Sequence, residues 1–232
     1  MRWSEWEPTY RAIARRLSLD VSLDFKATEM LTQILADQRP RREFEHLKHI
    51  MTDRDVVICG AGPSLDDHIE TLRAKSDLEN YTIVAADGAY RGLLSHGVRC
   101  DLIVTDLDGI DILHPPESLV IVHAHGDNMP LLERFVSQLG FVLGSTQVKP
   151  TPRVHLWGGF TDGDRACHIV AHYRPRRIIL AGMDFGVTVG RWSKPEFDRP
   201  HPASRRKQIK LEIAKQLVQR VLSTSNVAFT FL

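Results

Sequence analysis

Hydrophobic positions follow two patterns along the chain, and the pattern changes near residue 53. Up to residue 52, apolar residues recur three or four positions apart, which predicts helices with a break at Arg39-Pro40. From residue 53, short apolar runs alternate with amphipathic stretches. The runs predict strands at 55–59, 82–86, 102–105, 119–122, 154–157, 177–181 and 227–231. The stretches predict helices at 63–75, 89–96, 129–139, 162–172 and 203–222.

This alternation predicts an α/β fold with a mostly parallel, Rossmann-like sheet and helices on both faces. We expect an α/β catalytic domain at 53–232 and a helical N-terminal segment at 1–52. The N-terminal segment shows no chemistry of its own, which favours a helical cap or an oligomer surface. The stretch 187–202 contains three prolines and no periodicity, so a long loop is expected there, and loops of that length are commonly functional.

Acidic residues follow three of the predicted strands, each close to a glycine. Asp87 follows the run at 82–86, Asp106 and Asp108 follow 102–105, and Asp127 follows 119–122. The carboxyl ends of parallel strands share one edge of a sheet, so these side chains should line one crevice. Crowded carboxylates repel one another unless a cation compensates, and hard oxygen ligands favour Mg²⁺. Because Mg²⁺ in a crevice commonly arrives with a phosphate, the pattern predicts a Mg-nucleotide enzyme.

Two motifs near this edge add candidates that also fit structural roles. In His123-Ala124-His125-Gly126-Asp127-Asn128, Asp127 could contact the metal, while His125 and Asn128 could contact the substrate. A zinc or iron site is the alternative, but no further histidines stand at suitable spacing. Asp184 follows the run at 177–181 and could either recognise the N–H groups of a heterocycle or lie in a turn.

The start of the predicted helix at 162–172 carries both charge signs. Asp164 could serve the metal and Arg165 a phosphate, since arginine pairs well with phosphate oxygens. Thr161 or Asp162 could instead simply cap the helix.

A glycine-containing turn, Gly60-Ala61-Gly62-Pro63-Ser64, joins the first predicted strand to a helix. Glycine lets the backbone approach a phosphate, and Ser64 can donate to an oxygen. The turn lacks the third glycine of the dinucleotide fingerprint and the Gly-Lys-Ser/Thr of a P-loop, so a plain strand-to-helix turn is the alternative. Asp87 alone would also fit a ribose-binding acid, but a ribose needs one acid and this edge carries several.

Basic residues gather in the long loop and the final helix, where Lys207 and Lys210 share one helix face. A solvated basic face would explain them, but their place after the last crevice strand also fits a lid over a triphosphate. The group comprises Arg191, Lys194, Arg199, Arg205, Arg206, Lys207 and Lys210.

Composition narrows the class of protein further. The 232 residues are 43% hydrophobic and 25% charged, which is ordinary for a globular protein with a full core. A net charge of +1 gives no reason to expect a nucleic acid or a membrane surface as partner. The chain shows neither a signal peptide nor an apolar stretch of about 20 residues. Cys59, Cys100 and Cys167 stand far apart, as expected for buried thiols in a reducing cytoplasm.

Taken in order, the motifs resemble those of the archaeal 6-hydroxymethyl-7,8-dihydropterin pyrophosphokinases over roughly residues 55 to 215. The arrangement Asp-Gly-Ala followed by Asp-x-Asp-Gly is also similar to the catalytic domain of thiamin pyrophosphokinase, but the glycine turn and the 123–128 motif match the pterin enzymes. The motifs that carry the resemblance are 60–65, 86–89, 105–109, 123–128, 159–165 and 182–186.

The resemblance implies Mg²⁺-dependent transfer of diphosphate from ATP to the pterin hydroxymethyl group, with release of AMP, in methanopterin or folate synthesis. Asp87, Asp106 and Asp108 would then hold Mg²⁺, with Asp127 and Asp164 completing the shell. Arg165, Lys207 and Lys210 would face the phosphates, and Gly60, Gly62 and Ser64 the nucleotide. A thiamin pyrophosphokinase-like enzyme, a nucleotide-sugar-dependent transferase and a non-catalytic nucleotide-binding module remain alternatives, and a homo-oligomer is possible.

Overall fold

The computed structural model describes residues 1–74, 78–109 and 117–232. The strands of its large sheet are β1 (Asp55–Cys59), β2 (Thr82–Ala86), β3 (Leu102–Thr105), β4 (Leu119–Ala124), β5 (Val142–Thr146), β6 (Val154–His155), β7 (Arg177–Ala181) and β10 (Ala228–Phe231). The helices are α1 (Trp3–Leu17), α2 (Val21–Ile34), α3 (Arg41–Met51), α4 (Leu65–Arg73), α5 (Ala89–Ser95), α6 (Met129–Phe135), α7 (Asp162–His172) and α8 (Arg205–Thr224). A small sheet of β8 (Thr188–Val189) and β9 (His201–Pro202) and four 3-10 turns, η1 (Leu78–Asn80), η2 (Gly126–Asn128), η3 (Val136–Gln138) and η4 (Arg191–Ser193), complete the described elements.

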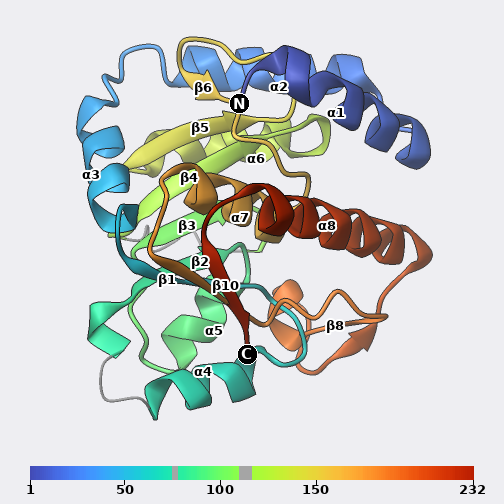
Figure 1. Ribbon diagram of the computed structural model, residues 1–232. Helices are drawn as coiled ribbons and strands as arrows, with labels where there is room; N and C mark the ends of the chain where they lie inside the picture. Colours follow the sequence, from blue (N-terminus) through green and yellow to red (C-terminus); the bar gives the residue numbers. More distant parts are fainter. Residues whose placement is uncertain (75–77, 110–116) are drawn as a thin grey trace.

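The large sheet has the strand order β10-β7-β1-β2-β3-β4-β5-β6, and all its neighbouring strands are parallel (Figure 1). Helices cover both of its faces, so the predicted architecture is confirmed. The chain runs from β1 to β2 on one side and later returns to place β7 on the other side of β1. In open α/β sheets, ligands bind beyond the carboxyl ends of the strands near such a reversal.

The two faces of β1 show how the core forms. Val56 and Ile58 pack in one apolar cluster with residues of α3, α7 and α8, whereas Val57 and Cys59 pack in another with α4 and α5. Successive side chains of a strand point to opposite faces, so a fully apolar strand needs helices on both sides. In a third cluster, α2 and α6 cover β3, β4 and β5. No helix in the described ranges is long and apolar enough to cross a membrane.

Two of the differences between the prediction and the structure bear on the site. β5 was not predicted, because Gly144 and Ser145 interrupt its apolar pattern. Gly144 fits there because its neighbours leave little space: an added Cβ atom would lie 3.0 Å from Leu35 and 3.1 Å from Val154. The predicted loop at 187–202 contains the β8–β9 hairpin and η4. This segment is therefore ordered by pairing with itself and by contacts described below.

Candidate active site

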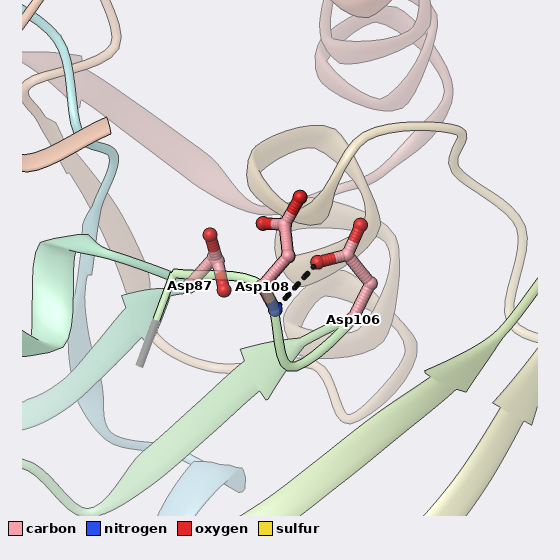
Figure 2. A group of neighbouring side chains, drawn as sticks. All are labelled: Asp87, Asp106 and Asp108. Carbon is pink, nitrogen blue, oxygen red and sulfur yellow. Dashed lines mark hydrogen bonds between the residues drawn. The ribbon is translucent and has the colours of Figure 1, made fainter. Parts of the chain in front are cut away.

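Three carboxylates gather at the carboxyl edge of the sheet, as the sequence predicts. Asp87 follows β2, while Asp106 and Asp108 lie on the turn after β3 (Figure 2). One oxygen from each lies within 4.8 Å of those of the other two. The Asp108 backbone N–H donates to Asp106 Oδ1 at 3.3 Å, so the turn closes on itself and brings both side chains to one side.

Asp87 is held in place by the neighbouring turn. Its Oδ1 accepts from Thr105 Oγ1 at 2.7 Å and from the Gly109 N–H at 3.1 Å. Its φ of 47° lies in the left-handed region, which aspartate tolerates better than most residues. A Cβ atom at position 109 would collide with the Asp87 carboxylate, so the glycine of the Asp-x-Asp-Gly motif makes room for the first acid.

The carboxylates strongly perturb one another. Burial, with the charges of Asp106 and Asp108, raises the pKa of Asp87 to about 7. Burial also raises the pKa of Asp162, at the start of α7, well above its ordinary value, and the charge of Asp106 adds to this shift. Such a cluster is unfavourable without a compensating cation. Its donors are all carboxylate oxygens, the ligands that Mg²⁺ prefers, so the residues present fit that ion.

His125 orients Asp106. Its Nδ1 atom accepts the Asp127 backbone N–H at 3.2 Å, so the proton of the neutral ring belongs on Nε2. Nε2 then donates to Asp106 Oδ2 at 3.1 Å. Burial alone would raise the pKa of Asp106, but the hydrogen bond from His125 outweighs burial and lowers this pKa below its ordinary value. His125 therefore keeps Asp106 ionised and aimed at the cluster.

Positive charge meets the cluster from two directions. Lys194, in the segment after η4, donates a hydrogen bond to Asp108 Oδ2. Burial alone would lower the pKa of Lys194, but the interaction with Asp108 raises it above its ordinary value. Lys207 and Lys210 of α8 line the same cavity and form no ion pair with any described residue. Burial, followed by the nearby charge of Lys207, lowers the pKa of Lys210. These two lysines are available to an anionic ligand.

Arg165 is 1% exposed and lies beneath the cavity. It donates to Asp162 Oδ1 at 2.9 Å and to the Phe160 carbonyl at 2.8 Å, while its Nε atom has no partner among the described residues. Asp162, which lines the cavity, is therefore the carboxylate that pairs with Arg165. These bonds fit a structural role for Arg165, and its contact with a phosphate stays a prediction.

Asp164 is placed differently from the other predicted metal ligands. It is fully buried and accepts from the backbone N–H groups of Phe160, at 2.6 Å, and Thr161, at 2.8 Å. Thr161 and Asp164 form a capping box at the start of α7, and Asp164 does not line the cavity. The spacing Thr-x-x-Asp is a recognisable signal for this role. Asp127, by contrast, is exposed and lines the cavity.

Asn128 also supports the site from outside the cavity. Its side chain donates to the carbonyls of Asp106, at 2.9 Å, and His123, at 2.7 Å, and accepts from the His125 N–H at 3.0 Å. All these bonds are internal, and the residue is 2% exposed. Asn128 thus joins the turn after β4 to the turn that carries the acids.

The glycine turn lines the cavity through Gly60 and Gly62, but the start of α4 already has an acidic partner. Asp184 accepts from Ser64 Oγ at 2.9 Å and from the Ser64 N–H at 3.3 Å. A Cβ atom at position 62 would collide with Asp184. Because a carboxylate occupies the helix start, this turn favours contact with an uncharged part of a ligand over contact with a phosphate.

One cavity of about 310 Å³ is lined by the three clustered aspartates, the two lysines of α8 and the glycine turn. It also contains residues that the sequence did not indicate, chiefly Leu19, Leu23 and Asp24 from the N-terminal segment and Gln147 after β5. The N-terminal segment, in which the sequence showed no chemistry, therefore forms a wall of the cavity.

A parallel α/β sheet whose carboxyl edge combines clustered carboxylates with lysines defines a class of protein suited to metal-dependent phosphoryl transfer. Residues 30–190 match the family described as 6-hydroxymethylpterin diphosphokinase MptE-like. The chain belongs to this family. The resemblance seen in the sequence is thus confirmed.

Three relatives extend this likeness over most of the chain, and each is named a 6-hydroxymethyl-7,8-dihydropterin pyrophosphokinase. The one from Pyrococcus furiosus is 38% identical over 94% of this chain and 94% of its own length. The one from Methanothermobacter thermautotrophicus is 46% identical over 71% of this chain and 72% of its own. The one from Methanocaldococcus jannaschii is 34% identical over 99% of both chains.

Proposed function

We propose that this chain transfers diphosphate from ATP to the hydroxymethyl group of 6-hydroxymethyl-7,8-dihydropterin and releases AMP. The observation that carries the proposal is the cluster of Asp87, Asp106 and Asp108 opposite the lysines of α8, in one cavity of a chain from this family. The pterin hydroxyl oxygen forms a bond to the β-phosphorus of ATP while the bond between that phosphorus and the α,β-bridging oxygen breaks. The hydroxyl proton leaves to solvent, and AMP takes the bridging oxygen.

Asp87, Asp106 and Asp108 would hold Mg²⁺, with Asp127 near enough to the cavity to take part through water. The ion would neutralise phosphate oxygens and polarise the attacking hydroxyl. Lys207 and Lys210 bind the triphosphate from the side of α8, and Lys194 binds it from the segment after η4. In phosphoryl transfer, positioning and charge neutralisation supply most of the acceleration, so the reaction can proceed without a dedicated general base.

The deciding experiment measures AMP formation from ATP and Mg²⁺ with 6-hydroxymethyl-7,8-dihydropterin, with thiamin, and with no acceptor. AMP with the pterin alone supports the proposal. AMP with thiamin would keep the mechanism and change the substrate. No AMP in any of the three, with Mg-nucleotide binding retained, would favour a sugar-nucleotide transferase or a non-catalytic nucleotide-binding module instead.

The metal assignment has its own test. Asp106→Asn and Asp108→Asn should each lower kcat by about 10²-fold or more while the protein stays folded. Near-normal turnover in both variants would exclude these residues as metal ligands.

A further inference from the structure

The order of the strands divides the cavity into three parts. Gly60 and Gly62 follow β1 and Gly182 follows β7, so they lie at one end. The three clustered aspartates follow β2 and β3 in the middle. Gly126 follows β4 and Gln147 follows β5, so they lie at the other end. Neighbouring strands are about 4.8 Å apart, which places β4 roughly 14 Å from β1. Two ligands can therefore meet at the aspartates from opposite sides.

The N-terminal segment forms the wall of the far end, where α2 packs against β4, β5 and β6 (Figure 1). Leu23 packs directly against Gly126, because a Cβ atom there would lie 2.6 Å from that of Leu23. We call this part of the cavity the α2 end. Its side chains include three apolar and two polar groups, Leu19, Leu23, Phe160, His123 and Gln147.

Asp24 fixes this wall to the rest of the site. Its carboxylate accepts from the Tyr10 hydroxyl, from Gln147 Nε2 at 2.7 Å and from the Gly126 N–H at 2.7 Å. These three donors come from α1, from the turn after β5 and from the turn after β4. A buried carboxylate with three donors is well satisfied, so the N-terminal segment is a fixed part of the cavity.

His123 gives the α2 end an unused hydrogen-bonding atom. The residue is 2% exposed and lines the cavity, and its Nδ1 atom is 3.1 Å from Ser145 Oγ. Its Nε2 atom has no hydrogen-bond partner among the described residues. Burial and the nearby Arg165 charge hold the pKa of His123 well below its ordinary value, so the ring is neutral. Buried polar atoms without partners are rare in native proteins, and at a cavity wall a ligand explains one.

Charge differs between the two sides of the α2 end, because Lys210 Nζ lies 6.0 Å from the centre of the Phe160 ring while carboxylates lie near Leu19 and Leu23. Asp20 and Asp127 are exposed and line the cavity beside the α2 end, and hydrogen bonding to Ser22 lowers the pKa of Asp20. Carboxylates repel a polyphosphate but accept hydrogen bonds from a neutral heterocycle that is rich in N–H groups. The side of the α2 end that carries Leu19 and Leu23, where these two carboxylates lie, therefore suits the neutral pterin ring better than it suits a phosphate group of ATP.

We propose that the α2 end is the acceptor subsite: the pterin ring packs against Leu19, Leu23 and Phe160, and its polar edge bonds to His123 and Gln147. This assignment rests on the proposed function and adds to it the place of each substrate. The hydroxymethyl group then points toward the clustered aspartates, and the nucleoside of ATP lies at the end formed by the turns after β1 and β7.

The test measures two affinities separately by calorimetry on the full chain with Mg²⁺ present. One titrant is 6-hydroxymethyl-7,8-dihydropterin, and the other is the non-reacting analogue α,β-methylene-ATP. Leu23→Ser and His123→Phe are expected to weaken pterin binding at least tenfold and to change nucleotide binding less than twofold. Leu23 is only partly buried, so its variant should fold even if the buried His123 variant does not. Glu29→Ala, at an exposed position of the same helix away from the cavity, should change neither affinity.

Each contrary outcome has one meaning. Weaker nucleotide binding with unchanged pterin binding in the folded Leu23→Ser variant would reverse the assignment of the ends. Unchanged binding of both ligands in that variant would also overturn it. Wild-type protein that binds no pterin and forms no AMP with it would instead overturn the proposed function. Wild-type protein that binds the pterin and forms AMP with it keeps the proposed function, so that a failure in the variants then concerns the subsite alone.

Discussion

Lys194 donates a hydrogen bond to Asp108 across 86 positions of sequence, and so joins the segment after β7 to the turn after β3. The lysine thus contacts a proposed metal ligand directly. A cation at this position offsets the repulsion among the three carboxylates. If Asp108 held Mg²⁺ as proposed, the Lys194 ammonium would be available to a phosphate oxygen. The contact places one residue of the segment 188–202 against the carboxylate cluster, and the role of this segment as a lid stays a prediction.

Replacing Lys194 should therefore affect catalysis far more than stability. Lys194→Ala is expected to lower kcat/KM for ATP by about 10²-fold, because one cation facing the developing phosphate charge is lost. The two side chains are 35% and 41% exposed, so the free energy of unfolding should change by less than about 1 kcal/mol. Steady-state AMP formation and urea unfolding measure the two effects. Arg199→Ala, at an exposed position of the same segment, is the matched control, and equal activity of both variants would contradict the role of Lys194.

Asp66 of α4 anchors the segment that carries Lys194. It accepts two bonds from Arg191, at 2.9 and 3.0 Å, and one from Trp192 Nε1 at 2.9 Å. Asp66→Asn should lower the free energy of unfolding by about 1–3 kcal/mol, because hydrogen bonds to a charged group are lost. It should also raise KM for ATP several-fold, since Lys194 is no longer held.

Glu70→Gln is the matched control for Asp66→Asn. Glu70 contacts the same His96 at 2.8 Å but forms no hydrogen bond or ion pair with the described residues of the segment after β7. The Glu70→Gln variant should keep the wild-type KM for ATP. If both variants raise KM equally, Asp66 acts only through the general stability of α4.

Sequence patterns identified the centre of the site because its residues follow directly from the strands. Asp87, Asp106 and Asp108 come immediately after apolar runs, and parallel pairing alone brings strand ends together. The role of Lys194 could not be found in this way, since its position depends on Asp66, far away in sequence. It appeared only as one basic residue among several.

The N-terminal wall was missed for a related reason. Leu23 and Asp24 fit an ordinary amphipathic helix, and only the packing of α2 on the turn after β4 gives them a place in the cavity. For Asp164 the sequence motif suggested a metal ligand, whereas in the structure its carboxylate caps the start of α7. Local chemistry is readable from sequence where the strand fixes the position, and much less so where distant contacts fix it.

Asp87→Asn should separate stability from activity. Asparagine keeps an oxygen for the Thr105 and Gly109 donors and tolerates the left-handed backbone, while one of three crowded charges is removed. At pH 8 without metal, the variant is expected to unfold at the same or a higher temperature than the wild type. Its kcat should fall by about 10²-fold or more, and added Mg²⁺ should no longer raise the melting temperature. A lower melting temperature without metal would show that repulsion in the cluster does not cost stability.

The network around Asp66 should also make stability depend on pH through His96. Hydrogen bonding to Asp66, at 2.8 Å, and to Glu70 raises the pKa of His96 above its ordinary value of 6.5. A group whose pKa is higher in the folded state stabilises the protein fully below its unfolded-state pKa. That contribution disappears as the pH rises through the folded-state value.

His96→Gln should therefore flatten the pH profile. Between pH 6 and pH 9, the wild type is expected to lose more unfolding free energy than the variant, so the difference between the two should shrink as the pH rises. Urea unfolding at several pH values measures it, and other titrating groups cancel because both proteins contain them. Burial alone would raise the pKa of Asp66, but its hydrogen bonds from Arg191, His96 and Trp192 lower this pKa to about 2. Asp66 therefore stays ionised from pH 6 to pH 9. A difference that is constant from pH 6 to pH 9 would mean that His96 is neutral in the folded protein and contributes only by packing.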